Sequence, residues 1–215
     1  MDDSIRMFNK SFNDLHFLQT LANNVKKYVF VFDFDLTMTI KSSDGWNKNK
    51  NFIELFDNEE KIEKLKMYFE RIVKSGHIIY INTRALIHDV KHILTTIGFE
   101  IGENKLIKEI MGSEQVHVIY YPFTISELNH YGLSDISNST VLWGLKKVTF
   151  LNKIVEREQI SAPNVLFFDD IDININTAKL NGFSNSFLIG SNDSGIYGLD
   201  YLLIKLEQIL QLFEI

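Results

Sequence analysis

Short apolar runs that alternate with helix-like segments constrain the fold of this 215-residue chain more than any other feature. Residues 28–32 read YVFVF, residues 77–83 read HIIYINT, and residues 164–170 read NVLFFDD. None of these runs alternates apolar with polar residues, which is typical of strands buried on both faces of a parallel sheet. We therefore predict strands at these three positions, and two more at 116–121 and 186–190.

Segments with helical periodicity separate the apolar runs. In the first one, Asp57 and Glu60 have capping-box spacing and Gly76 follows the last turn, which predicts a helix over 57–74. Further helices are expected at 86–97, 148–159, 174–181 and 199–213. This alternation predicts the α/β class, with a doubly wound, Rossmann-like parallel sheet and right-handed crossovers. The chain length fits a single domain over 1–215, with a loop insertion at about 40–56 and a small insertion at about 100–145.

Composition and charge narrow the class of protein. A net charge of −6 and a pI near 5.5 argue against nucleic-acid binding through a generally basic surface. The chain has no cysteine, so it has no disulfides, thiolate nucleophiles or cysteine-based zinc sites. No signal peptide and no transmembrane segment is expected, because no apolar run approaches 18 residues. These features favour a cytoplasmic protein, or one delivered into a host cytoplasm.

Polar side chains stand where several of the predicted strands end. Asp33 and Asp35 follow the first strand, Thr83 ends the second, and Asp169 and Asp170 end the run at 164–170. For a single acid, a strand that simply ends in a polar residue is an equally good explanation. Three such strand ends are harder to explain in this way, because ligands of open α/β sheets bind at the carboxyl ends of the strands. We therefore expect these side chains to converge on one site.

The ordered set of motifs resembles the haloacid dehalogenase (HAD) superfamily. The resemblance covers roughly residues 28–190, and residues 147–175, KVTFLNKIVEREQISAPNVLFFDDIDINI, are similar to the magnesium-dependent phosphatase-1 type. The matching residues are, in chain order, Asp33, Asp35, Thr37, Thr83, Lys147, Asp169, Asp170 and Asn174.

This resemblance implies a Mg2+-dependent phosphatase that forms an aspartyl-phosphate. Asp33 is then the nucleophile, and Asp35 protonates the leaving oxygen and later activates water. Mg2+ suits an all-oxygen site. The expected ligands are Asp33, Asp170 and the backbone carbonyl of Asp35, with Asp169 helping through water or hydrogen bonds. Which member of the Asp169–Asp170 pair binds the metal directly stays open.

Thr83 and a lysine are expected to hold the phosphate. Lys147 is preferred over its neighbour Lys146 because its distance from the second aspartate pair matches the magnesium-dependent phosphatase-1 type. For either lysine taken alone, a solvated helix face is the commoner explanation. Arg84 is a weaker candidate for a phosphate contact. His88 and Trp46 are weaker candidates for positions at the mouth of the site.

The substrate class is inferred from the spacing of the motifs. HAD enzymes that act on small metabolites usually carry a cap domain, and neither insertion is long enough for a large cap. We therefore expect an open site that admits a phosphorylated protein, with phosphotyrosine favoured and Trp46 or Phe123 stacking on its ring. The alternatives are a small-molecule phosphatase, such as a nucleotidase or sugar phosphatase, and a non-catalytic phosphate-binding module. The amphipathic helix at 199–213 either packs on the sheet or contacts a partner or membrane surface.

Overall fold

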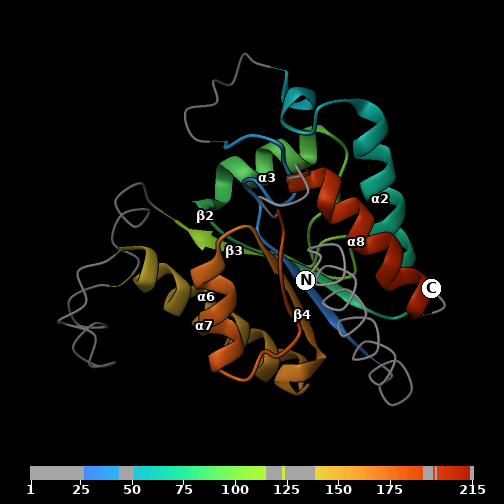
Figure 1. Ribbon diagram of the computed structural model, residues 1–215. Helices are drawn as coiled ribbons and strands as arrows, with labels where there is room; N and C mark the ends of the chain where they lie inside the picture. Colours follow the sequence, from blue (N-terminus) through green and yellow to red (C-terminus); the bar gives the residue numbers. More distant parts are fainter. Residues whose placement is uncertain are drawn as a thin grey trace, which may run out of the picture.

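A five-stranded parallel sheet forms the centre of the computed structural model, which describes residues 27–43, 51–114, 123, 139–190, 196 and 198–213 (Figure 1). The strands lie in the order β3-β2-β1-β4-β5, and every neighbouring pair is parallel. Their bounds are Val29–Phe32 for β1, Ile78–Leu86 for β2, Glu109–Ser113 for β3, Val165–Asp169 for β4 and Ser186–Leu188 for β5. The predicted α/β fold with a doubly wound parallel sheet is confirmed.

Helices cover both faces of the sheet. On one face lie α2, α3 and α8, and on the other lie α6 and α7 (Figure 1). Their bounds are Glu59–Lys74 for α2, Ile87–Thr96 for α3, Ser139–Glu158 for α6, Asp172–Leu180 for α7 and Gly198–Leu212 for α8, with 3-10 turns at Phe52–Leu55 and Ala162–Asn164. Within the described residues, no helix combines the length and the apolar character that crossing a membrane requires.

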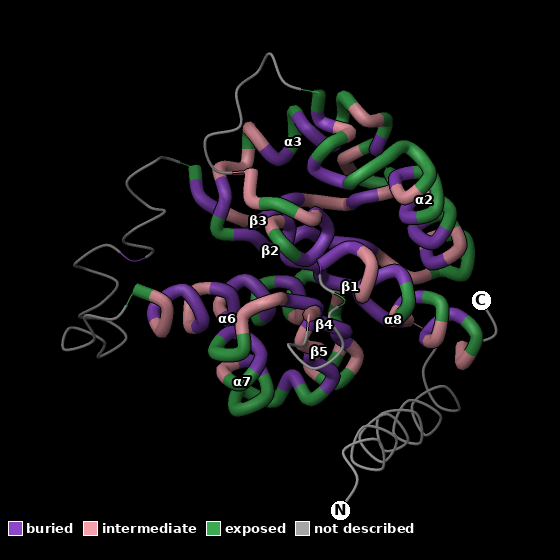
Figure 2. Tube along the Cα trace, turned by 45° about the horizontal axis from the view of Figure 1, so that its top comes forward, coloured by how far each residue is buried: buried purple, intermediate pink, exposed green. Residues whose placement is uncertain are grey.

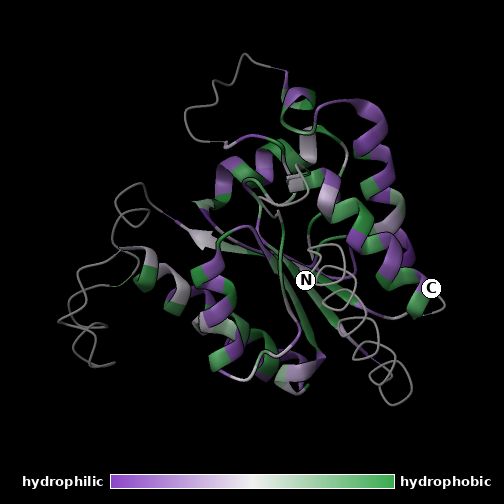
Figure 3. Ribbon diagram, viewed as in Figure 1, coloured by the Kyte–Doolittle hydropathy of each residue, from purple (hydrophilic) through white to green (hydrophobic). Residues whose placement is uncertain are grey.

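The central strands are buried on both sides, as their apolar runs predict (Figure 2). On the side of α2 and α8, the ring of Phe32 stacks on Phe168 at 4.8 Å and on Phe69 at 5.0 Å between centroids. On the side of α6, Val31 and Phe167 pack in a second apolar cluster. Apolar residues gather along these strands (Figure 3), and burying each large side chain contributes about 1.5–3 kcal/mol. Two apolar layers thus fix the sheet from which the site is built.

Several element boundaries differ from the sequence-based expectation, and β2 continues to Leu86, past its predicted end at Thr83. The edge strand β3 lies at 109–113, whereas the predicted strand at 116–121 falls outside the described residues. Helix α6 begins at Ser139, nine residues before the predicted start. The N-cap of α2 is Asn58 and not Asp57, because the Asn58 side chain accepts a hydrogen bond from the Lys61 N–H at 3.0 Å.

The insertion expected at about 100–145 is partly occupied by core elements. Strand β3 and the first turns of α6 lie within that range, and most of the residues between them are outside the described part of the chain. The insertions at about 40–56 and 100–145 stay predictions, because 44–50 and most of 115–138 lie outside the described residues.

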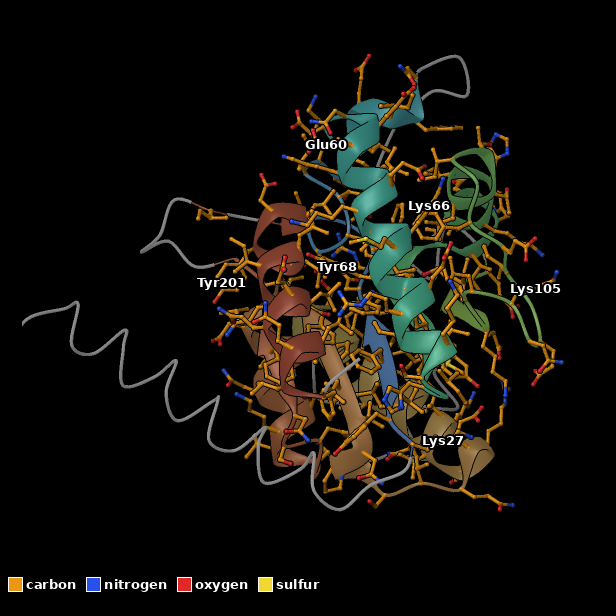
Figure 4. The ribbon with its side chains drawn as sticks, turned by 90° about the vertical axis from the view of Figure 1, so that its right-hand side faces the viewer. Lys27, Glu60, Lys66, Tyr68, Lys105 and Tyr201 are labelled. Carbon is orange, nitrogen blue, oxygen red and sulfur yellow. The ribbon has the colours of Figure 1, made fainter. Side chains whose placement is uncertain are left out.

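The C-terminal amphipathic helix packs inside the domain. Leu199, Leu202 and Leu206 on α8 are fully buried in the same cluster as the apolar face of α2. Figure 4 shows the two helices side by side, and the hydroxyl of Tyr68 on α2 donates a hydrogen bond to Glu207 on α8. Of the two readings of this segment, the structure favours packing on the sheet.

Candidate active site

The carboxyl ends of β1, β2 and β4 bring the expected residues together at one edge of the sheet. Residues Phe32 and Phe168 are register partners, and the Asp33 N–H donates to the Phe168 carbonyl at 2.8 Å. Asp33 is therefore held beside Asp169, the last residue of β4. Parallel pairing of β1 with β4 thus places Asp33 next to Asp169, although the two residues are 136 positions apart in the sequence.

Lys147 joins this pair from α6, which packs on the face of the sheet opposite to α2 and α8. Its ammonium nitrogen lies 2.7 Å from Asp33 Oδ1 and also contacts Asp169 Oδ2. Only 3% of the Lys147 side chain is exposed. Lys146 points elsewhere, because its Nζ lies 4.8 Å from the centroid of the Phe123 ring. The geometry therefore selects Lys147 as the cation beside the aspartates.

Asp169 is saturated by hydrogen bonds. Besides the Lys147 contact at Oδ2, its Oδ1 accepts from the Ile171 N–H and from the Asn174 side-chain amide, both at 2.9 Å. The neighbouring Asp170 is less buried and completes an acidic cluster. Carboxylate oxygens of Asp33, Asp169 and Asp170 all lie within 4.8 Å of one another.

The acidic groups of this cluster outnumber its single ammonium group. Burial raises the pKa of Asp33 well above its usual range, the charges of Asp169 and Asp170 add to the rise, and Lys147 opposes it. Burial, helped by the charge of Asp169, raises the pKa of Asp170 to about 6. Burial alone would lower the pKa of Lys147, but the charges of Asp169 and Asp33 raise it instead. Three carboxylates thus face one ammonium, an arrangement that attracts a divalent cation.

The turn after β1 carries Asp35 and has an unusual backbone. Leu36 adopts a left-handed conformation with a φ of 58°, which costs a non-glycine residue about 1–3 kcal/mol. The turn closes through a hydrogen bond from the Met38 N–H to the Phe34 carbonyl at 2.9 Å. Asp35 Oδ1 accepts from the Ser43 N–H at 2.6 Å, so the carboxylate has a fixed orientation. Strain of this kind is commonly kept where function needs it.

Thr83 supplies a hydroxyl to the same site. It is buried, and its Oγ1 accepts a hydrogen bond from the Ala85 N–H at 3.1 Å, which leaves its own hydrogen for a ligand. Thr83 lines a cavity of about 100 Å³ together with Asp33, Asp35 and Lys147. A second cavity of about 610 Å³ adjoins the first and shares Leu36 and Asp170 with it. The small cavity has groups suited to a phosphate, and the larger one has room for an organic group.

The remaining sequence candidates have different outcomes. Arg84 is exposed but lines the small cavity. His88 forms an exposed contact with Asp89 at 3.1 Å and does not line this cavity. Phe123 is buried beneath Lys146, so it is not positioned to stack on a substrate, and Trp46 lies outside the described residues.

Thr140 and Trp143 line the small cavity from the first turns of α6 and were not among the sequence candidates. Leu36, Ser42 and Ile171 also line it and were not candidates either. Thr140 and Trp143 fall within the insertion expected at about 100–145, so no helical register was available to place them. The aromatic residue three positions after Thr140 was the only available signal.

Comparisons with known proteins agree with this fold. No protein-family model and no curated protein sequence matches the chain. Among solved structures, the cobalt-bound deoxy-D-mannose-octulosonate 8-phosphate phosphatase from Haemophilus influenzae superposes with a TM-score of 0.53 at 9% identity, covering 92% of this chain and 91% of that one. The 3-deoxy-D-manno-octulosonate 8-phosphate phosphatase from Moraxella catarrhalis, with magnesium, phosphate and KDO, gives 0.51 at 14% identity, covering 92% and 94%.

The chain has the fold of these phosphatases. The fold prediction that came from the HAD-like motifs is thereby confirmed. A hypothetical protein from Xanthomonas campestris gives a similar TM-score of 0.52 at 12% identity, covering 94% of this chain and 88% of that one. The narrower resemblance to the magnesium-dependent phosphatase-1 type is not confirmed by these matches and stays a prediction.

Proposed function

We propose that the chain is a Mg2+-dependent phosphoric monoester hydrolase that works through an aspartyl-phosphate on Asp33. The observation that carries this proposal is the buried contact of Lys147 with Asp33 and Asp169, with Asp170 completing the acidic cluster. A buried triad of this kind is expensive to maintain for stability alone. Its place at the carboxyl ends of parallel strands is where α/β folds bind ligands.

The donor set fits Mg2+. Asp33, Asp170 and the carbonyl of Asp35 supply oxygen atoms, the ligands that Mg2+ prefers. Both carboxylate oxygens of Asp169 already hold hydrogen bonds, which supports Asp170 as the direct ligand and Asp169 as its support. When bound, the ion supplies positive charge that offsets the repulsion between the phosphate and the cluster.

The residues divide the reaction between them. The Asp33 carboxylate attacks phosphorus in line with the departing oxygen, and protonated Asp35 gives its proton to that oxygen as the P–O bond breaks. In the second step, the Asp35 carboxylate takes a proton from water, which attacks phosphorus and releases Asp33. Thr83 donates to a phosphate oxygen, while Lys147 orients Asp33 and favours its ionised form.

A small phosphomonoester is the substrate class that we propose. The preference for a phosphotyrosine protein rested on the missing large cap, and nothing in the comparisons supports it. The two matched phosphatases named above act on a small sugar-acid phosphate. The adjoining cavity of about 610 Å³ lies in the range of small-molecule sites. The alternative of a sugar phosphatase or nucleotidase therefore replaces the protein phosphatase as the main proposal.

A substrate panel tests the proposal. We expect hydrolysis of p-nitrophenyl phosphate in Mg2+ and its loss in EDTA, and a higher kcat/KM for sugar phosphates or nucleotides than for phosphotyrosine and phosphoserine peptides. Asp33→Asn serves as the matched control for contaminating phosphatases. Absence of any Mg2+-dependent turnover would favour the non-catalytic phosphate-binding module. A clear preference for phosphopeptides would restore the protein phosphatase.

A further inference from the structure

The start of α8 lies against the turn that carries Asp35. Gly198, the first residue of α8, is buried and has a φ of 53°. A Cβ at this position would stand 2.6 Å from the Thr39 carbonyl oxygen and 3.0 Å from that of Leu36. Both oxygens belong to the turn after β1, so the start of α8 is in close contact with the backbone of this turn. Only glycine fits this contact.

The same turn is held from inside by Thr39. Its buried Oγ1 accepts a hydrogen bond from the Leu36 N–H at 3.0 Å and donates to the Lys41 carbonyl at 2.7 Å. These bonds keep Leu36 in its left-handed conformation. The turn therefore has a hydroxyl on its inner side and a helix start packed against its carbonyls.

Helix α8 is a firm support for this contact. Leu199 and Leu202 are fully buried in the core cluster that also holds the apolar face of α2. Asp200 in the first turn of α8 pairs with Lys61 of α2 at 2.7 Å. A side chain added at Gly198 would therefore move the turn and not the helix.

We propose that Gly198 is a positioning residue for Asp35, acting through the turn from Leu36 to Thr39. This inference rests on the proposed function, since it requires Asp35 to be the acid–base group. An ordinary contact needs at least 3.4 Å, so a methyl group at Gly198 would push the Thr39 carbonyl away by about 0.8 Å. A proton donor must stay within about 2.6–3.2 Å of its target, and a misplacement of about 1 Å costs on the order of 100-fold in rate.

The experiment compares two leaving groups in Gly198→Ala. The p-nitrophenolate ion departs without a proton, whereas an alkoxide needs the proton that Asp35 supplies. We compare kcat/KM, because it reports formation of the aspartyl-phosphate, whereas hydrolysis of that intermediate is common to both substrates and affects kcat alone. We expect kcat/KM for an alkyl phosphate from the substrate panel to fall by about 100-fold, while kcat/KM for p-nitrophenyl phosphate changes little. Equal losses on both substrates, or no loss, would overturn the positioning role.

Gly76→Ala is the matched control. Gly76 has a similar positive φ of 84°, but a Cβ there would meet no atom within 4 Å. This variant carries the same backbone strain without the clash, at the loop between α2 and β2. We expect a modest loss of stability and an unchanged ratio of kcat/KM between the two substrates.

A second pair of variants covers the case in which Gly198→Ala does not fold. Thr39→Val removes the hydroxyl that holds Leu36, and Thr39→Ser keeps it. A fall of kcat/KM for the alkyl phosphate alone in Thr39→Val, with recovery in Thr39→Ser, supports the positioning role of this turn. An unchanged kcat/KM for the alkyl phosphate in Thr39→Val contradicts it.

Asp35→Asn distinguishes a failure of the proposed function from a failure of the positioning role. If this variant loses kcat/KM equally for both substrates, the proposed role of Asp35 as the acid for the leaving group is wrong. If it loses the alkyl phosphate selectively but Gly198→Ala and Thr39→Val do not, the proposed function stands and the positioning role alone is overturned.

Discussion

Replacing Lys147 by methionine removes a buried positive charge that contacts two buried carboxylates of the site. Methionine is close to lysine in length and shape, so the apolar packing of the stem is largely kept. Asp33 and Asp169 would then face each other without the ammonium that lies 2.7 Å from Asp33 Oδ1. The change therefore isolates the electrostatic role of the lysine in folding.

The size of the loss follows from this geometry. At an effective dielectric constant of about 20, two unit charges 2.7 Å apart attract each other by about 6 kcal/mol. The cost of burying the lysine offsets part of this attraction. Breaking a buried ion pair by removing one partner typically costs about 3–5 kcal/mol. For a chain of this length, that loss corresponds to a fall in Tm of about 6–20 °C.

Urea denaturation followed by circular dichroism measures the free energy of unfolding. In EDTA we expect Lys147→Met to lose about 3–5 kcal/mol, and in saturating Mg2+ to lose less because the ion supplies positive charge to the same cluster. Lys146→Met is the control, with an expected loss of about 1 kcal/mol or less, since that ammonium lies over aromatic rings. A loss below about 1 kcal/mol for Lys147→Met in EDTA would refute the reasoning.

Three further outcomes are expected. Asp33→Asn should lower turnover by several orders of magnitude with little change in the circular dichroism spectrum, and substantial residual activity would contradict a covalent intermediate. Mg2+ should raise the Tm modestly, and Asp170→Asn should abolish most of this rise in a thermal scan. Burial lowers the pKa of His77, whose Nδ1 accepts from the Tyr28 N–H at 3.2 Å. Because the unfolded chain binds this proton near pH 6.5 and the folded chain only at lower pH, the contribution of His77 to stability should fall as pH drops below about 6.5, whereas the raised pKa values of Asp33 and Asp170 act in the opposite direction. His77→Asn, which keeps an acceptor but does not titrate, should therefore lose less stability than the unchanged protein between about pH 7 and 5, and an identical change of the two urea midpoints would rule out His77 as a contributor.

The buried strands were predictable because a continuous apolar run in the sequence indicates a strand that is buried on both faces. Strands β1 and β4 are continuous apolar runs, and each ends in the aspartates that form the site. The edge strand β3 gave no such signal, since it reads EIMGS and includes Gly112. A Cβ on that glycine would lie 2.9 Å from the Thr83 and Ala85 carbonyl oxygens, so the residue is required by close approach to β2. Such a requirement depends on a neighbour that local sequence does not reveal.

The site was predictable in its members but not in its internal contacts. The order of motifs indicated Asp33, Thr83, Lys147 and Asp169. The sheet brings the first two and Asp169 to one edge, and α6 brings Lys147 to the same place. Lys147 was weighed against Lys146 only by resemblance, because which of two adjacent helical residues faces the sheet depends on how α6 packs. The substrate class was harder still. The motif spacing predicts only how a substrate enters, whereas the cavity beside Asp170 indicates what size of group fits.

The position of β1 in the sheet has a consequence for how the chain is made. β1 pairs with β2 through Val29 and Ile78, but its other neighbour is β4, where Val29 meets Val165. At a synthesis rate of about 5–20 residues per second, β4 leaves the ribosome roughly 7–27 s after β1. During that interval the central strand has one open edge, and Asp33 still lacks the lysine that balances it. The open edge of β1 therefore stays exposed until β4 is translated, and fragments that stop before β4 should aggregate more readily.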